Sequence, residues 1–553
     1  MEVQLRDPNT VMKLSKLGSF HQSKLSFLRS FLKEFKDWDF KRDLFDLDEN
    51  GFGKAIYSFK KNRRTYSLVS FTNKITDTER SDRVIATKWD AAFALHDGIP
   101  SQKDIERLSE NVPKQEAGRV TCKELSLARA NKSVRIFDHV VDSLSQGKQP
   151  DKQLLSKVGY LYRTTAVYGS GKCGLADRFR IKDRKEICGP FRLEMMLVYL
   201  VRQFTFDQIN HIAKLKNPNK AIKLDNDIAR NLGIGNSTGL GLAPFIVNHP
   251  ILLNNWIYCR EKALKEIRSI EKIEAKDFNI FLDCLSRSKI NIDSWLTESD
   301  YQKNKIKSLK SDLKKFNQYL ENNCSVKIQH LWNKIYTWVE SNLSNEGIEY
   351  IVSMIMEPYD NITDPLINKM SAQEEKYFTI PAHRKLKEVK KIIENNYKSL
   401  IKIDYEDKKN ITNFWFLSKN KAEPRIANRY QEYGSELEQP LAIGRDVKQL
   451  YHRILEANQN DTVAEFLLYN DDLRHIVRRV FIVEQFPYSE IQDNIIGDSL
   501  VPIDLLRLKL SFFGANKFDP KSDKWLRINM YQGAPLPHEL KFSNDTWIYN
   551  SLI

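Results

Sequence analysis

The chain has 553 residues, 41% of them hydrophobic and 11% aromatic, a composition typical of a folded protein of about two to four domains rather than a disordered one. Its formal net charge of +15 favours anionic partners without distinguishing nucleic acids from small anions. The longest apolar stretch, 195–201, is too short to cross a bilayer and the N-terminus lacks a signal-peptide pattern, so we expect a cytoplasmic protein without membrane association.

The first hundred residues combine a helical pattern with strand patterns. Residues 9–38 carry leucine and phenylalanine at steps of three to five, which predicts one helix. Residues 40–95 consist of short runs rich in aromatic and β-branched residues, separated by turn signals. The last run, 83–95, fits either a fourth strand or a strand followed by a helix. We therefore expect an N-terminal α+β domain over 1–100 with a small antiparallel sheet.

Helical patterns dominate after this first domain. Apolar residues at steps of three and four predict a helix over 121–146, and a further helix is predicted over 151–166. Residues 191–213 are apolar almost all round, which is typical of a buried central helix. The stretch 251–357 contains no proline and a single glycine, which predicts long helices. We expect a helical core domain over 101–357.

The C-terminal region, 358–553, is richer in proline and more mixed in pattern. Helices are predicted over 384–397, 443–457 and 471–484, and the remainder is expected to form ordered loops. The fold class expected for the whole chain is therefore α+β and predominantly α-helical, with a large helical body following the small N-terminal sheet.

Two short segments hold seven of the 21 glycines, "YGSGKCG" at 168–174 and "GIGNSTGLG" at 233–241. Glycine admits positive φ and bares the backbone amides, so that successive N–H groups form a concave nest for an anion. The first segment is not a Walker A motif, because the GxxxxGK[ST] spacing is absent and a helical pattern precedes it. The residues expected to bind an anion here are Gly169, Ser170, Gly171, Lys172, Gly174 and Arg178, with Arg163 as a further candidate cation.

The second segment differs from the dinucleotide fingerprint GxGxxG by one residue, because its third glycine comes four positions after the second and not three. A polar helical pattern rather than a strand precedes it, which argues against a Rossmann site. The residues expected to contact a ligand here are Gly235, Asn236, Ser237, Thr238 and Gly239. The candidates for proton transfer are His249 and Tyr168.

Two glycine-rich segments that flank one buried helix favour a shared site. The leading hypothesis is a cytoplasmic enzyme that binds a phosphate- or carboxylate-bearing small molecule in a pocket formed by both segments, with reaction type and cofactor left open. The histidines are scattered and the cysteines lack metal-ligand spacing, so no metal site is expected. A competing explanation is that the glycines only permit close packing.

Nucleic-acid binding is the alternative from another class. The stretch 301–316 has six lysines against one aspartate, which fits a solvated helix face or a phosphate-binding stripe. Residues 227–241 also have the pattern of a helix-turn-helix, although Gly239, Gly241 and Pro244 would interrupt its recognition helix. The sequence leaves the oligomeric state open.

Overall fold

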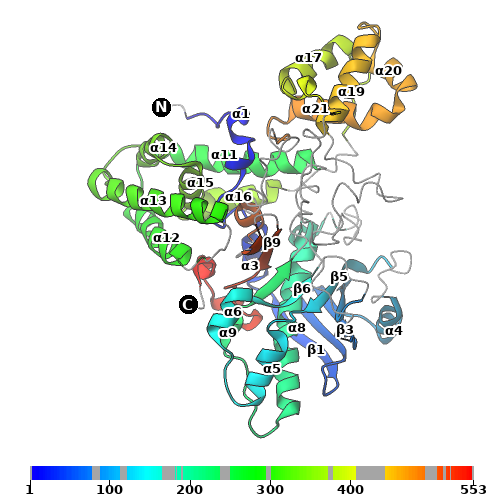
Figure 1. Ribbon diagram of the computed structural model, residues 1–553, viewed down its shortest axis with the longest axis vertical. Helices are drawn as coiled ribbons and strands as arrows, with labels where there is room; N and C mark the ends of the chain where they lie inside the picture. The colour runs from blue at the N-terminus through cyan, green and yellow to red at the C-terminus, as the bar shows by residue number, and fades with distance from the viewer. Residues whose placement is uncertain are drawn as a thin grey trace.

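A mixed β-sheet stands at the centre of the fold, and helices pack on and beside it (Figure 1). The computed structural model describes residues 3–76, 88–111, 121–164, 181, 183–188, 191–236, 249–293, 295, 300–370, 378–406, 443–491, 507, 509–514, 518–522 and 525–550. Within these residues nine strands form one sheet in the order β1-β2-β3-β4-β5-β6-β7-β9-β8. The strands are β1 (Asp39–Leu47), β2 (Gly53–Lys61), β3 (Arg64–Thr72), β4 (Ala91–Asp97), β5 (Glu124–Lys132), β6 (Tyr160–Thr164), β7 (Gly233–Asn236), β8 (Phe518–Ser522) and β9 (Trp525–Met530).

The sheet corrects the expectation of a small antiparallel one, because it is larger and its strands are of mixed direction. Neighbouring strands are antiparallel from β1 to β6, whereas β6 and β7 are parallel. The predicted helix 121–146 is in fact strand β5 followed by helix α5 (Phe137–Ser145). Because β5 is buried along nearly its whole length, it lacks the alternation of a half-exposed strand, and its apolar spacing resembles that of a helix.

Two helices cover one face of the sheet and a third lies on the other. The central helix α8 (Arg192–Lys216) is buried on most sides, which confirms the expectation for 191–213, and it lies beside α3 (Phe27–Phe35). On β2, Tyr57 and Phe59 belong to the large core beneath α8, while Ile56 packs in a second cluster under α4 (Gln102–Asn111). This alternation is the period of two that places successive side chains on opposite faces.

The N-terminal segment is not the single helix expected over 9–38. It contains three separate helices, the short α1 (Pro8–Val11) and α2 (Leu14–Leu17) and the longer α3. Gly18 ends α2 in an extended conformation. The residues between α2 and α3 are largely buried and non-helical, so the apolar spacing reflects burial on several sides and not one helical face.

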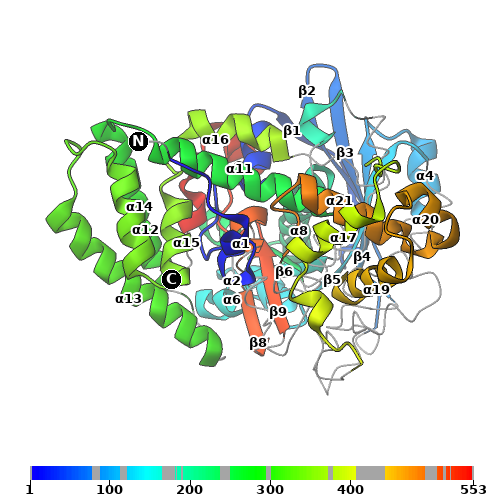
Figure 2. The ribbon, with the colours of Figure 1, turned by 90° about the horizontal axis from the view of Figure 1, so that it is seen from above.

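Most of the remaining helices form two groups, one at the left and one at the right of Figure 2. The expectation of long helices over 251–357 is confirmed by α11, α12 and α13, and the three helices predicted in the C-terminal region correspond to α17, α19 and α21. The helical body consists of α11 (Pro250–Arg268), α12 (Ala275–Asp293), α13 (Asp300–Asn323), α14 (Leu331–Asn342), α15 (Asn345–Met354) and α16 (Asp360–Ile367). The second group consists of α17 (Leu386–Asn396), α19 (Ile443–Glu456), α20 (Val463–Tyr469) and α21 (Arg474–Gln485).

Strands of the one sheet come from all three regions proposed from the sequence. The region 1–100 supplies β1 to β4, the region 101–357 supplies β5 to β7, and the region 358–553 supplies β8 and β9. None of the described helices is both long and apolar enough to span a bilayer.

Candidate anion-binding sites

The strand that precedes the first glycine-rich segment and the strand that begins the second are neighbours in the sheet. Strands β6 and β7 are parallel neighbours, and Arg163 of β6 pairs with Gly235 of β7. The first segment follows the carboxyl end of β6 and the second continues from β7. In open sheets, ligands bind characteristically beyond the carboxyl ends of parallel strands. The expected residues outside the described part of the chain are Tyr168, Gly169, Ser170, Gly171, Lys172, Gly174, Arg178, Ser237, Thr238 and Gly239.

The first segment is preceded by a strand and not by the helix predicted over 151–166. The short helix α6 (Lys152–Val158) ends at Gly159, which adopts a left-handed conformation with φ of 75°. A glycine in this conformation commonly terminates a helix, and β6 begins at the next residue. The order along the chain is therefore strand β6, glycine-rich segment, helix α8 and strand β7, with α7 (Lys185–Cys188) and α9 (Asn226–Arg230) flanking α8.

Close packing accounts for two glycines of the second segment. A Cβ atom on Gly233 would lie 2.3 Å from the carbonyl oxygen of Met530, and one on Gly235 would lie 2.6 Å from the ring of Tyr160. Strand β7 also pairs with β6 on one side and β9 on the other, so its backbone groups serve the sheet. Any amides of this segment that bind an anion must therefore come after Asn236.

The structure also locates the other predicted site residues that it describes. Arg163 is buried within β6, at 5% exposure, next to Gly235 in the sheet. His249 precedes α11 and makes no side-chain hydrogen bond to cap that helix. The helix α11 packs mainly on α14, α16 and α21, and its Trp256 packs on Phe191, the residue before α8.

The structure describes only the first part of the helix-turn-helix pattern, because the expected recognition helix with Gly239, Gly241 and Pro244 lies outside the described residues. The helix α9 is followed by strand β7 over Gly233–Asn236. Glycine is a poor helix former, and the pairing of β7 with β6 and β9 gives these residues a place in the sheet instead.

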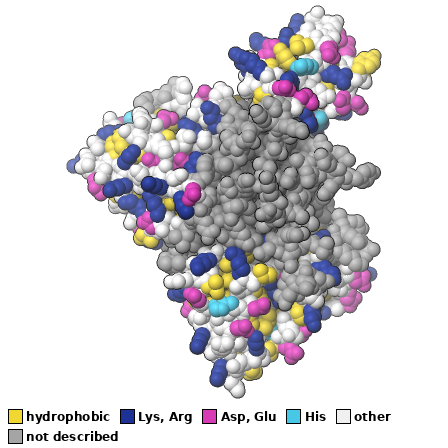
Figure 3. All heavy atoms as spheres, viewed as in Figure 1, with side chains coloured by type: hydrophobic (Ala, Val, Ile, Leu, Met, Phe, Trp, Pro, Cys, Tyr) yellow, Lys and Arg dark blue, Asp and Glu magenta, His cyan; other side chains and the backbone are white. Residues whose placement is uncertain are grey.

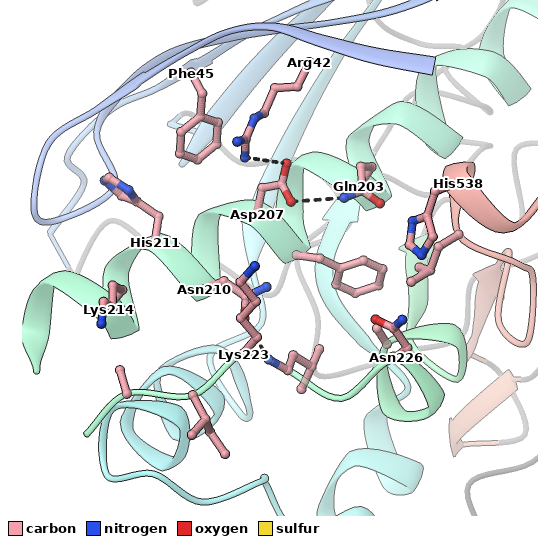
Figure 4. A pocket seen from close by; sticks show the side chains of 16 residues that line it. Arg42, Phe45, Gln203, Asp207, Asn210, His211, Lys214, Lys223, Asn226 and His538 are labelled. Atoms are coloured by element: carbon pink, nitrogen blue, oxygen red, sulfur yellow. Dashed lines mark hydrogen bonds and ion pairs between the residues drawn. The ribbon is translucent and has the colours of Figure 1, made fainter. Parts of the chain in front are cut away.

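A groove of about 650 Å³ lies on the side of α8 that faces β1 and the chain around α9 (Figure 4). Such a volume is typical of small-molecule sites. The groove has mostly apolar and basic walls. The described residues that line it are Arg42, Phe45, Gln203, Phe206, Asp207, Asn210, His211, Lys214, Ala221, Ile222, Lys223, Leu224, Asn226, Ala229, Leu536 and His538.

Asp207 is the one carboxylate among these described lining residues, and three donors hold it. It accepts hydrogen bonds from the Tyr57 hydroxyl at 2.9 Å, the Gln203 amide at 3.0 Å and the Arg42 guanidinium at 3.3 Å. Burial raises the pKa of Asp207, while these donors act to lower it. His211 is also fixed, because its Nε2 lies 3.0 Å from the backbone oxygens of Leu47 and Asp48.

Sequence reasoning missed this groove because its residues are spread from β1 to the C-terminal region and form no local motif. One signal was nevertheless present. Polar residues at positions 203, 207, 210, 211 and 214 recur at helical spacing and form a stripe along a helix that is otherwise apolar. A polar stripe on a central helix indicates either solvent contact or a binding site.

Comparison of the chain with protein-family models, curated proteins and solved structures finds no significant match. The described residues also contain no group of three or more histidine, cysteine, aspartate or glutamate side chains that could hold a metal ion. The function is therefore inferred from the arrangement of the residues themselves.

Proposed function

We propose that the protein is an enzyme that binds a phosphate- or carboxylate-bearing small molecule beyond the carboxyl ends of β6 and β7. The observation that carries the proposal is the parallel pairing of these two strands, since each strand runs toward one of the glycine-rich segments. Backbone amides of the two segments would bind the anionic group, and Lys172 and Arg178 would neutralise its charge. His249 and Tyr168 are the proposed proton-transfer groups.

Native mass spectrometry of protein purified from its source tests this proposal. We expect the wild-type protein to carry a small anionic molecule and Lys172→Ala to lose it, because a charge-assisted contact is removed. The matched control is Lys185→Ala, which removes an exposed lysine from α7. A bound molecule that Lys172→Ala retains, or wild-type protein with no bound molecule, would count against the proposal.

A second candidate function, nucleic-acid binding, is favoured by the surface of α13. Lys303, Lys307, Lys310 and Lys314 are exposed and follow one another at steps of four, three and four, so they share one face of the helix. Figure 3 shows Lys and Arg side chains gathered over this part of the molecule. Among the described residues, Lys303 pairs with Asp300 and Lys310 with Asp293, whereas no ion pair involves Lys307 or Lys314.

A salt titration of single-stranded oligonucleotide binding tests this second candidate. Each lysine–phosphate contact contributes about 0.7 to the slope of log K against log salt for single strands. The double variant Lys307→Gln/Lys314→Gln should therefore lower the slope by about 1.4 if both lysines contact phosphates. The control Lys387→Gln/Lys391→Gln removes two exposed lysines of α17, on another part of the surface, and should leave the slope unchanged.

A further inference from the structure

We propose that the groove shown in Figure 4 is a binding site for a nucleoside phosphate, separate from the site proposed beyond β6 and β7. The helix α9, which contributes to the groove, ends at Arg230, and β7 begins at Gly233. The groove therefore lies toward the amino end of β7, whereas the glycine-rich segments follow the carboxyl ends of β6 and β7. The two sites are at opposite ends of the same strands, and neither proposal rests on the other.

The charge of the groove favours an anion. Its described lining contains three Lys or Arg residues and two histidines against the single carboxylate of Asp207. Arg42 already pairs with Asp207, which leaves Lys214 and Lys223 as cations without a carboxylate partner in the described part of the chain. The ammonium of Lys214 donates to the backbone oxygen of Pro218, and such a contact leaves its charge uncompensated.

Of the two lysines without a carboxylate partner among the described residues, Lys214 lies at one end of the groove and Lys223 near its middle (Figure 4). Figure 4 shows His211 and Lys214 on α8 toward one end, and His538 and Asn226 toward the other. Asn210 lies between them, with its side-chain oxygen accepting a hydrogen bond from the backbone amide of Leu224 at 2.8 Å. A ligand with its charged group near Lys214 and Lys223 and its neutral polar groups toward Asn226 matches this arrangement.

The neutral lining favours a heteroaromatic ring as the body of the ligand. The Gln203 nitrogen donates to Asp207 and the Asn210 oxygen accepts from Leu224, so these two side chains offer a ligand one acceptor and one donor. With the amide of Asn226, they supply the donors and acceptors that recognise the edge of a nucleobase. The Oε1 atom of Gln203 is buried and has no hydrogen-bond partner among the described residues, so it gains an acceptor role if the side chain turns toward a ligand. Apolar side chains that include Phe45 and Ile222 complete the walls and would cover the ring faces.

The size of the groove excludes the simplest anions as its natural occupants. A volume of about 650 Å³ is within the range of roughly 300–1,000 Å³ found for sites of drug-sized ligands, and a bare phosphate would fill only a small part of it. A simple aliphatic acid offers no hydrogen-bond donor to the buried Oε1 atom of Gln203, which would stay without a partner. A nucleoside phosphate supplies the charge, the polar ring edge and the apolar ring face together.

Isothermal titration calorimetry on the full chain tests the proposal with the four common nucleoside monophosphates, the matching nucleosides and inorganic phosphate. We expect at least one monophosphate to bind more tightly than both its nucleoside and inorganic phosphate. Lys223→Gln should weaken binding of that monophosphate about tenfold or more, because a hydrogen bond between charged groups is removed, and should leave nucleoside binding unchanged. Gln203→Leu should weaken binding of both.

Lys220→Gln is the matched control, because Lys220 is exposed three residues before Lys223 and does not line the groove. Circular dichroism of each variant checks that its fold is retained. The proposal is overturned if no monophosphate binds more tightly than inorganic phosphate, or if Lys223→Gln binds like Lys220→Gln. It is also overturned if Lys172→Ala abolishes nucleotide binding while Lys223→Gln does not, a result that would instead support the site beyond β6 and β7.

Discussion

Arg202 is a buried charge of α8 that is held by backbone carbonyls. It is 1% exposed, and among the described residues no carboxylate lies within ion-pair distance. Burial lowers its pKa to about 10, so it remains protonated at neutral pH. Its guanidinium donates to the carbonyl oxygens of Ala229, Arg230, Leu232, Ala534 and Pro535. Arg202 thereby joins the central helix to α9 and to the chain after β9.

Replacing Arg202 by leucine should lower the free energy of unfolding by about 3 kcal/mol or more, because each buried carbonyl left without a donor costs roughly 1–3 kcal/mol. Urea denaturation measures this change. Arg63→Leu, which removes an exposed arginine from the turn between β2 and β3, is the control and should change stability by less than about 0.5 kcal/mol. Equal stability of the two variants would show that Arg202 is not a structural clamp.

Glu357 is a second buried charge, and Arg29 and His21 hold it. Arg29 donates to its two oxygens at 2.7 and 2.8 Å, and the Nε2 of His21 lies 2.9 Å from Oε1. Burial alone would raise the pKa of Glu357, but the charge and hydrogen bonds of Arg29, with those of His21, lower it well below its usual value. The folded protein therefore binds this proton less readily than the unfolded chain.

The stability that Glu357 confers is present above the ordinary glutamate pKa of about 4.3 and is lost as the pH falls below it. We expect the free energy of unfolding to fall more steeply between about pH 5 and 3 for the wild type than for Glu357→Gln, by up to about 1.4 kcal/mol per pH unit. Urea denaturation at several pH values measures both slopes. Glu34→Gln, at an exposed position, should keep the wild-type slope. Identical slopes for Glu357→Gln and the wild type would contradict this assignment.

At the scale of the element, the sequence predicts most helices correctly where apolar residues recur at helical spacing or where proline and glycine are absent over a long stretch. The central helix, the long helices of the body and α17, α19 and α21 all follow this rule. The buried strands β5 and β6 were assigned to helices, because a strand covered on both faces has no alternation to distinguish it. The short strands β7 to β9 form by pairing, and β7 pairs with strands that lie far away in the sequence. A local sequence pattern does not reveal such pairing.

The two candidate sites, at the glycine-rich segments and in the groove on α8, differ in how far the sequence indicates them. Glycine content pointed to the segments at 168–174 and 233–241, although two of the four glycines of the second segment, Gly233 and Gly235, are explained by packing in β7. The groove was not predicted, since Arg42, Lys223 and His538 come from distant parts of the chain. Local chemistry can be read from a sequence, whereas a site assembled by tertiary contacts requires the fold.

Gly235 is a test of how tightly β7 is packed. In Gly235→Ala the new Cβ would lie 2.6 to 2.8 Å from atoms of the Tyr160 ring, so the strand or the ring must move. We expect a loss of about 1–3 kcal/mol in the free energy of unfolding, as for other overpacked cores. Tyr160→Val should partly relieve the clash, so the double variant should be more stable than the sum of the single effects. Additive effects in this double-mutant cycle would mean that Tyr160 is not what excludes a side chain.

At the scale of the whole molecule, the sheet joins parts of the chain that the sequence would assign to separate regions. Residues 1–100 contain β1 to β4 and α3, but helix α8, which covers the face carrying Tyr57 and Phe59, comes from the next region. The outer edge of β4 is also paired, with β5. Separation of the first hundred residues would therefore expose both a large apolar face and an unpaired strand edge.

We accordingly expect the fragment 1–100 not to fold by itself. Aromatic side chains that are fully buried beneath α8 would face water, and the loss of roughly 1.5–3 kcal/mol for each large side chain exceeds what the remaining strands and short helices can offset. The exposed edge of β4 would also favour aggregation. The fragment should show no cooperative thermal transition by circular dichroism and little amide dispersion by NMR, whereas the full chain should melt cooperatively. A fragment with a sharp transition and dispersed amide signals would establish 1–100 as an independent domain, and the shared sheet would then be an interface between domains instead of a common core.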